Sequence, residues 1–470
     1  MFKSALLLLS GNIFGSLMLL VRNLVVARLV SIEDYGIAAT FAISMAVVEM
    51  MTSLGLHQMI VQDSKGNDPD LQSGLQGFHL LRAVFSGLTL FLLAGPIARF
   101  MGIPEVTWAY QMLALIPVMN GLMHFDNYRL QRQMKYLPSI LSSSIPAFLS
   151  VLMIWPLFTM FGDYRVMLFS VLAQSAMTVI ASHVLAERAY RLSLNKGVIA
   201  RAFSFGWPLL LNNILLFAVF QGDKMIVGRE LGLAALAIFA MGFTLTLTPT
   251  LVAAKSAQSF FLPQLSASKD DPKRFSRLSM ATLQTSLANG LFVVVVVALI
   301  GKPVVFFLLG EKYQALLPYL TWLAILQSLR VFKAGSSVVA LALGQTSNAM
   351  IANLCRMASL CVAWYVAAHG GDLYAIIWIA IAGESAGFLV SLALVHVRLK
   401  QPVKPMIAPN LLGVATLVMA GLHALLSAGE DGTLQGWALA GVVLLFIASL
   451  ATMRDLRHYI LERTLNKYSE

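Results

Sequence analysis

Long apolar segments follow one another along almost the whole chain, and this feature constrains the fold more than any other. About fourteen stretches of about 18 or more largely apolar residues lie between residues 4 and 453. Inside a bilayer a helix satisfies all of its own backbone hydrogen bonds. The sequence therefore predicts an all-α polytopic membrane protein with about fourteen transmembrane helices. No polar stretch is long enough to form a separate soluble domain.

The charged residues indicate how these helices cross the membrane. The net charge is +11, and only 12% of the residues are charged, whereas soluble domains have about 25%. Basic residues gather in alternate short loops, at 129–135, 188–201, 269–277, 398–404 and 454–467. This placement follows the positive-inside rule and argues against a nucleic-acid partner. It predicts cytoplasmic loops at these positions, both termini in the cytoplasm and an even number of spans.

Part of the sequence recurs at a constant offset. Asn12 and Arg28 correspond to Asn213 and Arg229, in each case 201 positions later. Chance matching of apolar residues is the alternative, but the recurrence of polar residues favours a true repeat. We predict two pseudo-symmetric six-helix lobes, at 1–200 and 201–400. Residues 401–470 would add two peripheral helices and a cytoplasmic tail. Repeats of this kind place a substrate between the lobes and work by alternating access.

Several ionisable residues lie inside the apolar segments. An ionised side chain in hydrocarbon is costly, so we expect such residues to face a water-filled interior. The cations are Arg22, Arg82, Lys224, Lys255, Arg330, Lys333 and Arg356, and the anions are Glu49, Asp126, Asp223 and Glu384. Because the cations are in excess, we predict a cationic cavity for an anionic substrate. Arginine forks and lysine ammonium groups bind phosphate well.

The depth of each cation decides between two interpretations, substrate binding and snorkelling of the side chain towards the membrane surface. Arg330, Lys333 and Arg356 are the deepest, and Arg330 and Lys333 share one helix face. These three are the favoured substrate ligands. The other four have alternatives: Arg82 and Lys255 could snorkel to the cytoplasmic face, and Arg22 and Lys224 could snorkel outward or pair with Asp223.

The anions have two interpretations as well. Glu49 and Glu384 are predicted near the middle of their segments, where a paired or neutral carboxyl costs less than a free charge. Each could couple transport to H⁺ or Na⁺, or could hold an arginine in place as its counter-charge, and we favour the counter-charge. Asp126 is predicted to be a residue at a helix end.

Four short motifs, in order along the chain, carry a resemblance to a known family. They are residues 26–36 (VARLVSIEDYG), 205–229 with FGWPL and QGDKMIVGR, 261–263 (FLP) and 308–313 (LLGEKY). Together they resemble Wzx-type oligosaccharide flippases of the multidrug/oligosaccharidyl-lipid/polysaccharide (MOP) superfamily. The resemblance implies a MATE/MurJ-like fold in the bacterial inner membrane. It also implies a polyprenyl-pyrophosphate-linked oligosaccharide as substrate, moved from the cytoplasmic to the periplasmic leaflet for exopolysaccharide, capsule or O-antigen synthesis.

Signatures of catalysis are missing from the sequence. It has no Walker A loop, no zinc-spaced His/Cys set and no nucleophile elbow, so we expect neither an enzyme nor a bound cofactor or metal. The expected partners are the lipid-linked oligosaccharide, the membrane and, in the cell, a polysaccharide polymerase and export machinery. Three alternatives stay open: a cation-coupled multidrug exporter of the same superfamily, a membrane-embedded enzyme, and a scaffold that transports nothing.

Overall fold

The computed structural model describes residues 2–52, 54–63, 65–345, 347–427 and 432–467, and this part of the chain contains helices and no strands. Ten of its helices are long and apolar enough to cross a membrane, or eleven if one bent pair forms a single span. The chain is therefore a multi-pass helical membrane protein. The count of about fourteen spans stays a prediction.

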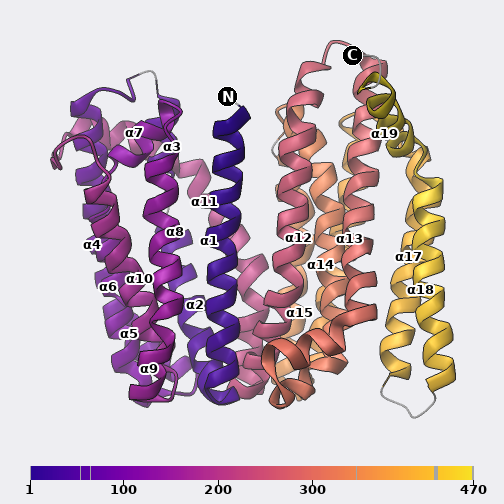
Figure 1. Ribbon diagram of the computed structural model, residues 1–470, viewed down its shortest axis with the longest axis horizontal. Helices are drawn as coiled ribbons and strands as arrows, with labels where there is room; N and C mark the ends of the chain where they lie inside the picture. The colour runs from indigo at the N-terminus through magenta and orange to yellow at the C-terminus, as the bar shows by residue number, and fades with distance from the viewer. Residues whose placement is uncertain (1, 53, 64, 346, 428–431, 468–470) are drawn as a thin grey trace. The chain divides into compact units, whose positions relative to one another are not determined.

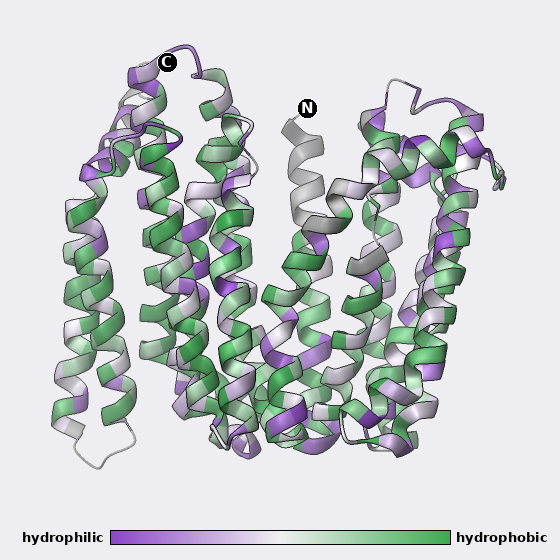
Figure 2. Ribbon diagram, turned by 180° about the vertical axis from the view of Figure 1, so that it is seen from behind, coloured by the Kyte–Doolittle hydropathy of each residue, from purple (hydrophilic) through white to green (hydrophobic). Residues whose placement is uncertain are grey.

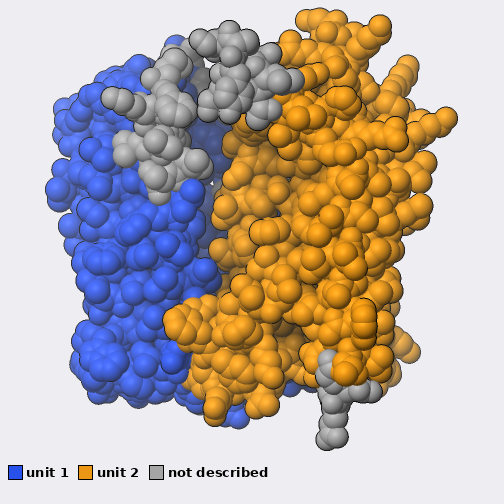
Figure 3. All heavy atoms as spheres, turned by 45° about the vertical axis from the view of Figure 1, so that its right-hand side comes forward, with its two compact units in different colours: residues 1–237 blue, residues 238–470 orange. Residues whose placement is uncertain are grey.

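Contacts between residues divide the chain into two compact units, Met1–Ala237 and Ile238–Glu470 (Figure 3). In each unit, hydrophobic residues cover the middle of the helices and hydrophilic residues collect at their ends and in the connections (Figure 2). This distribution is expected of helices whose middles lie in hydrocarbon. The division into two lobes, at 1–200 and 201–400, and a C-terminal part at 401–470 stays a prediction.

Unit 1 consists of helices that pack in neighbouring pairs (Figure 1). Its elements are α1 (Phe2–Leu29), α2 (Ile32–Thr52), α3 (Leu56–Gln62), α4 (Pro69–Phe100), η1 (Pro104–Val106), α5 (Thr107–Leu113), α6 (Leu115–Gly121), α7 (Asp126–Arg132), α8 (Leu137–Leu152), α9 (Ile154–Phe161), α10 (Arg165–Val184), α11 (Lys196–Ile226) and the π-helical turn η2 (Val227–Leu231). Helix α8 packs against α1 and α10, α4 packs against α5 and α6, and α11 packs against α2.

Unit 2 is built around α14. Its elements are α12 (Leu233–Ala267, which begins in the last residues of unit 1), α13 (Pro272–Leu309), η3 (Glu311–Leu316), α14 (Leu317–Ala342), α15 (Ser347–Ala368), α16 (Leu373–Val397), η4 (Lys404–Met406), α17 (Ile407–Leu426), α18 (Gly432–Thr452) and α19 (Arg454–Lys467). In α14, 72% of the most apolar window is buried, against 50% or less in the other candidate spans. Helices α13 and α16 pack against α14, whereas α17 and α18 pack on each other and on α13.

Aromatic pairs align α14 with α16. Their ring centroids lie 4.6, 4.4 and 5.4 Å apart in the pairs Tyr319–Tyr374, Trp322–Trp378 and Phe332–Phe388. Because the numbers rise together along both helices, α14 and α16 run in the same direction. This alignment places the middle of α16 beside Arg330 and Lys333.

The local structure repeats along the chain much as the sequence does. Helices α2 and α12 begin at residues 32 and 233, which differ by the offset of 201 found in the sequence. Helices α4 and α13 each begin with a proline after an aspartate cap, Asp68 or Asp271, which accepts backbone N–H bonds of the first turn. Each of these two helices also contains a proline near its far end, Pro96 or Pro303. The pseudo-symmetry of the two lobes stays a prediction.

Candidate functional site

Four ionisable side chains predicted from the sequence meet in the interior of unit 2. Glu384 of α16 accepts from Arg330 Nε at 2.7 Å through Oε1, and its Oε2 lies 2.5 Å from Lys333 Nζ. Arg356 Nε of α15 lies 3.5 Å from the same Oε1. One carboxylate thus joins three cations from two other helices. We call these four residues the cation cluster.

Neutral side chains support each cation of the cluster. Arg330 donates to Gln327 Oε1 at 3.1 Å, and Lys333 donates to Asn353 Oδ1 at 3.1 Å. Arg356 donates to Ser359 Oγ at 2.7 Å. The Arg330 guanidinium also lies over the ring of Phe243 of α12, 5.1 Å from its centroid. These contacts orient the cations together with Glu384.

Two glycines let α15 approach α16 closely enough to form the cluster. Gly383 and Gly387 flank Glu384 in a G-x-x-x-G spacing. A Cβ at Gly383 would lie 2.2 Å from Ser359 Oγ, and one at Gly387 would lie 2.7 Å from the carbonyl oxygen of Ala352. Small residues at this spacing allow close contact between transmembrane helices. The motif is visible in the sequence, where it is a signal of a close helix contact beside Glu384.

Burial strengthens the electrostatics of the cation cluster. Arg356 and Glu384 are 0% exposed, and Lys333 is 7% exposed. The three cations and one carboxylate sum to +2. In a low-dielectric interior this excess favours the approach of an anion, because charged hydrogen bonds are stronger there than in water. Chemically, the cluster offers an anion three cationic donors, two guanidinium groups and one ammonium group.

The predicted residues of α1 and α11 are largely enclosed in unit 1. Arg22 is 9% exposed and donates to the amide oxygen of Gln174 on α10. Asp223 is 1% exposed, and Lys224 is half-buried. These three residues belong to unit 1, and the cation cluster belongs to unit 2.

Arg82 and Glu49 lie in a second region of unit 1. Arg82 donates to His79 Nδ1 at 3.2 Å, and the Nε2–H of His79 donates to the carbonyl oxygen of Asn120 at 3.1 Å. Glu49 is exposed and interacts electrostatically with Arg82. Helix α2 ends at Thr52, so Glu49 lies in its last turn, and the depth of Glu49 in the membrane stays a prediction. In unit 2, Lys255 is exposed on α12.

Asp126 is the centre of a different, structural cluster. It is 0% exposed and accepts from Arg129 Nε at 2.5 Å, from the backbone N–H of Glu187 at 2.8 Å and from that of Arg188 at 3.2 Å. The side chain of Gln72 on α4 donates to it at 3.4 Å. Asp126 therefore ties the segment after α10 to α7 and α4.

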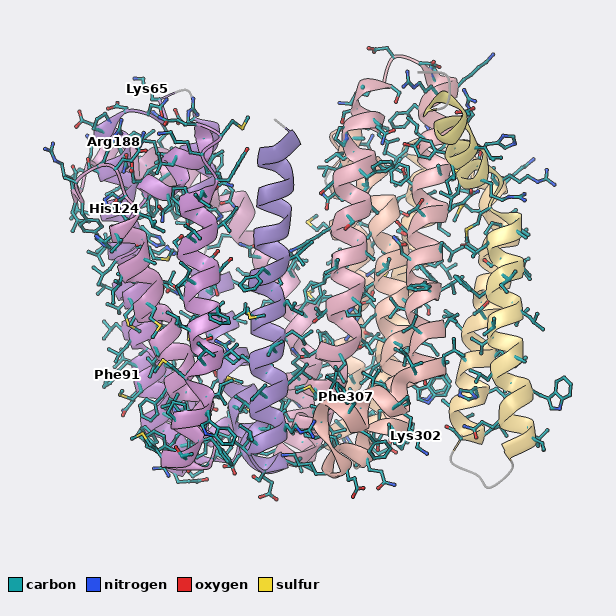
Figure 4. All side chains as sticks on the ribbon, in the orientation of Figure 1. Lys65, Phe91, His124, Arg188, Lys302 and Phe307 are labelled. Atoms are coloured by element: carbon teal, nitrogen blue, oxygen red, sulfur yellow. The ribbon has the colours of Figure 1, made fainter. Side chains whose placement is uncertain are left out.

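The surface around Asp126 is strongly polar. Figure 4 places Lys65, His124 and Arg188 at one end of unit 1, whereas Phe91 lies further down α4, where it is 49% exposed. Hydrogen bonds from Lys135 and Arg129 lower the pKa of Glu187 in this region below its usual value. Among the described residues, no group of three or more His, Cys, Asp or Glu side chains could hold a metal ion.

Comparison with known proteins identifies relatives in polysaccharide synthesis. A family model described as "Polysaccharide biosynthesis protein" matches residues 25–318. The succinoglycan biosynthesis transport protein ExoT of Rhizobium meliloti (strain 1021) is 24% identical over 317 residues, which cover 64% of this chain and 61% of ExoT. An uncharacterized membrane protein in the cps region of Klebsiella pneumoniae is 22% identical over 378 residues, covering 79% of this chain and 75% of that protein.

Solved structures of two transporters share the fold. The lipid II flippase MurJ, in an inward closed conformation, matches with a TM-score of 0.72 and 16% identity, covering 96% of this chain and 99% of MurJ. A multidrug resistance MATE family transporter of the MOP superfamily, in an inward-facing conformation, matches with a TM-score of 0.64 and 16% identity, covering 82% and 96%. The predicted MATE/MurJ-like fold is confirmed. The family match covers more than half of the sequence, so the chain belongs to the polysaccharide biosynthesis protein family, and the four motifs that resemble Wzx-type flippases of the MOP superfamily lie within the matched residues.

Proposed function

We propose that the protein moves a polyprenyl-pyrophosphate-linked oligosaccharide from the cytoplasmic to the periplasmic leaflet by alternating access. The product would serve exopolysaccharide, capsule or O-antigen synthesis. The observation that carries this proposal is the cation cluster, in which Arg330, Lys333 and Arg356 share the single carboxylate of Glu384 inside a membrane helix bundle. Pyrophosphate offers several oxygens to these donors at once.

The relatives support the same substrate class. ExoT is named for succinoglycan transport, and the structurally similar MurJ is a flippase of lipid II. We also propose the inner membrane as the location of the protein, with fourteen spans and cytoplasmic termini as the apolar segments and basic loops predict. Its partners in the cell would be a polymerase and export machinery. Arg22, Lys224, Arg82 and Lys255 would contact the substrate elsewhere along its path.

Cation-coupled drug export is the second candidate, because a MATE transporter shares the fold. A site for cationic drugs needs carboxylates that outnumber its basic groups, and the cation cluster has the opposite balance. We therefore favour the anionic substrate. Coupling to H⁺ or Na⁺ is compatible with either function, and Glu49, Asp223, Glu384 and Asp126 are the candidate groups.

Alanine substitution in the cation cluster tests the proposal. We expect Arg330→Ala and Arg356→Ala to abolish polysaccharide export in a strain that depends on this protein, because losing one charged partner costs about 2–5 kcal/mol of binding free energy. Arg→Lys at either position should restore export only in part, since lysine lacks the planar fork. Surface polysaccharide is measured against protein level in the membrane.

Arg274→Ala is the matched control, because Arg274 is an exposed arginine of α13 in the same unit. It should leave export unchanged. Full export by both Arg330→Ala and Arg356→Ala, at normal protein levels, would refute the assignment of the cation cluster to substrate binding.

A further inference from the structure

Glu384 holds an unusual place in the cation cluster, because it is an anion at the centre of a site that we assign to an anionic substrate. Both of its carboxylate oxygens face cations, and it is 0% exposed. Among the described residues, its ion-pair partners are Arg330, Lys333 and Arg356.

The orientation of the cations does not depend on this carboxylate alone. Each cation already has a neutral partner, in the pairs Arg330–Gln327, Lys333–Asn353 and Arg356–Ser359. The close approach of α15 to α16 depends on Gly383 and Gly387. A role for Glu384 beyond packing must then lie in its charge, which sets the sum of the cluster to +2 instead of +3.

The sugar-linked and the free form of a polyprenyl pyrophosphate differ in net charge. A sugar-linked pyrophosphate is a diester with a charge of about −2, whereas the free polyprenyl pyrophosphate is a monoester whose terminal phosphate loses a further proton near pH 6, giving about −3. A net charge on a buried complex is costly. A cluster of +2 therefore matches the diester, and a cluster of +3 would match the monoester.

We infer that Glu384 determines substrate selectivity, by matching the cation cluster to the sugar-linked pyrophosphate diester against the free pyrophosphate monoester. This inference rests on the proposed function. The free lipid pyrophosphate shares the lipid and both phosphates with the substrate. Glu384 would exclude it because the charge of the cluster and the charge of the monoester differ in magnitude by one. Discrimination by an unfavourable charge against the wrong ligand is a general route to specificity.

A pair of short-chain ligands tests the inference on the purified full-length protein. The ligands are farnesyl pyrophosphate, the monoester, and farnesyl-pyrophosphoryl-N-acetylglucosamine, the diester. Their affinities are measured by isothermal titration calorimetry at pH 8. The quantity of interest is the ratio of the two affinities in each variant, so contacts to the sugar, which are the same in every variant, cancel from the comparison.

Three variants change the charge of the cluster in known steps. Glu384→Gln raises it by one, and we expect the affinity ratio to shift about tenfold towards the monoester. Lys333→Gln lowers it by one and should shift the ratio in the opposite direction. The double variant Glu384→Gln/Lys333→Gln restores the original charge, and its ratio should return to within about threefold of the wild type. Glu311→Gln, at an exposed carboxylate of η3, is the control and should leave the ratio unchanged.

The outcomes separate this inference from the proposed function. If the wild type binds both ligands and Glu384→Gln leaves the ratio unchanged, the inference is refuted and the proposed function stands. A double variant that keeps the shifted ratio of Glu384→Gln also refutes it, because the identity of residue 384 would then matter more than the charge. If Glu384→Gln does not fold, the affinity ratios of Lys333→Gln and of the double variant still test the inference. If the wild type binds neither ligand, the proposed function fails and this inference with it.

Discussion

Two buried carboxylates, Asp126 and Glu384, both pair with arginine, but their partners differ in kind. Asp126 accepts from two backbone N–H groups as well as from Arg129 and Gln72. Backbone partners cannot leave without moving the chain, so Asp126 fixes local structure. The partners of Glu384 are cationic side chains, which can turn towards another anion. The same residue chemistry therefore fixes local structure in unit 1, whereas in unit 2 it suits the binding site that we propose.

Removing the Asp126 carboxylate should destabilise the protein strongly. We expect Asp126→Ala to cost about 3–5 kcal/mol, because it removes the buried partner of Arg129, which among the described residues keeps only the exposed Glu187 as a counter-charge. It also leaves the backbone N–H groups of Glu187 and Arg188 without their acceptor. The measurement is the unfolding midpoint of the purified protein in detergent. Asp163→Ala is the control: Asp163 pairs with Arg165 at 2.8 Å, but both side chains are partly exposed, and the midpoint should change little. Equal shifts in the two variants would contradict the structural role of Asp126.

At the scale of the helices, α19 joins two neighbours in unit 2. The buried amide of Gln284 on α13 donates to Asp455 Oδ2 at 3.1 Å and accepts from the backbone N–H of Leu456 at 2.8 Å. On α12, Gln264 accepts from the hydroxyl of Tyr459 at 2.7 Å, and the Tyr459 ring lies 5.6 Å from that of Phe261. Helix α19 thus bridges the end of α12 and the first half of α13.

Breaking the contact at the start of α19 should loosen this helix selectively. Gln284→Ala removes the partners of Asp455 and Leu456, so backbone amides of α19 should exchange hydrogen faster, by about tenfold, for a net loss of about 1–2 kcal/mol. Hydrogen-exchange mass spectrometry of peptides from 454–467 measures this. Arg457→Ala, an exposed position on the same helix, is the control. Unchanged exchange in Gln284→Ala would show that α19 does not depend on this contact.

The sequence predicted the helices better than their breaks and contacts. Hydropathy locates α14 and α16 because each crosses about one bilayer thickness, and the spacing of Arg330 and Lys333 places both on one face. The break between α2 and α3 was missed, because it depends on Gly55 in a left-handed conformation at φ +62°, within an otherwise apolar stretch. The pairing of Glu384 with three cations depends on which helices are neighbours, and helix spacing alone does not determine this.

At the scale of the whole chain, the two units begin their helices in similar ways. The offset of 201 residues holds for the starts of α2 and α12, and the aspartate–proline start recurs at α4 and α13. The connection between α1 and α2 is formed by Val30 and Ser31, whereas α12 is preceded by a π-helical turn and by Gly232 at φ +87°. Similar helix starts with different turns are expected of a repeat that keeps its packing and varies its connections. The equivalence of Arg28 and Arg229 within two lobes stays a prediction.

Reporter fusions can test the topology that the repeat and the basic loops predict together. Because the basic loops alternate along the chain, fusions after Lys404 and after Glu470 should both report a cytoplasmic position. A fusion after Ser427, at the end of α17, should report the periplasm, since α17 would cross the membrane once from the basic segment around Lys404. Alkaline phosphatase and green fluorescent protein give opposite signals at each site and control for expression. A periplasmic signal after Glu470 would reject the even total of spans. A periplasmic signal after Lys404 would also reject two six-helix lobes of parallel orientation, because only an even number of spans per lobe returns the chain to the same side.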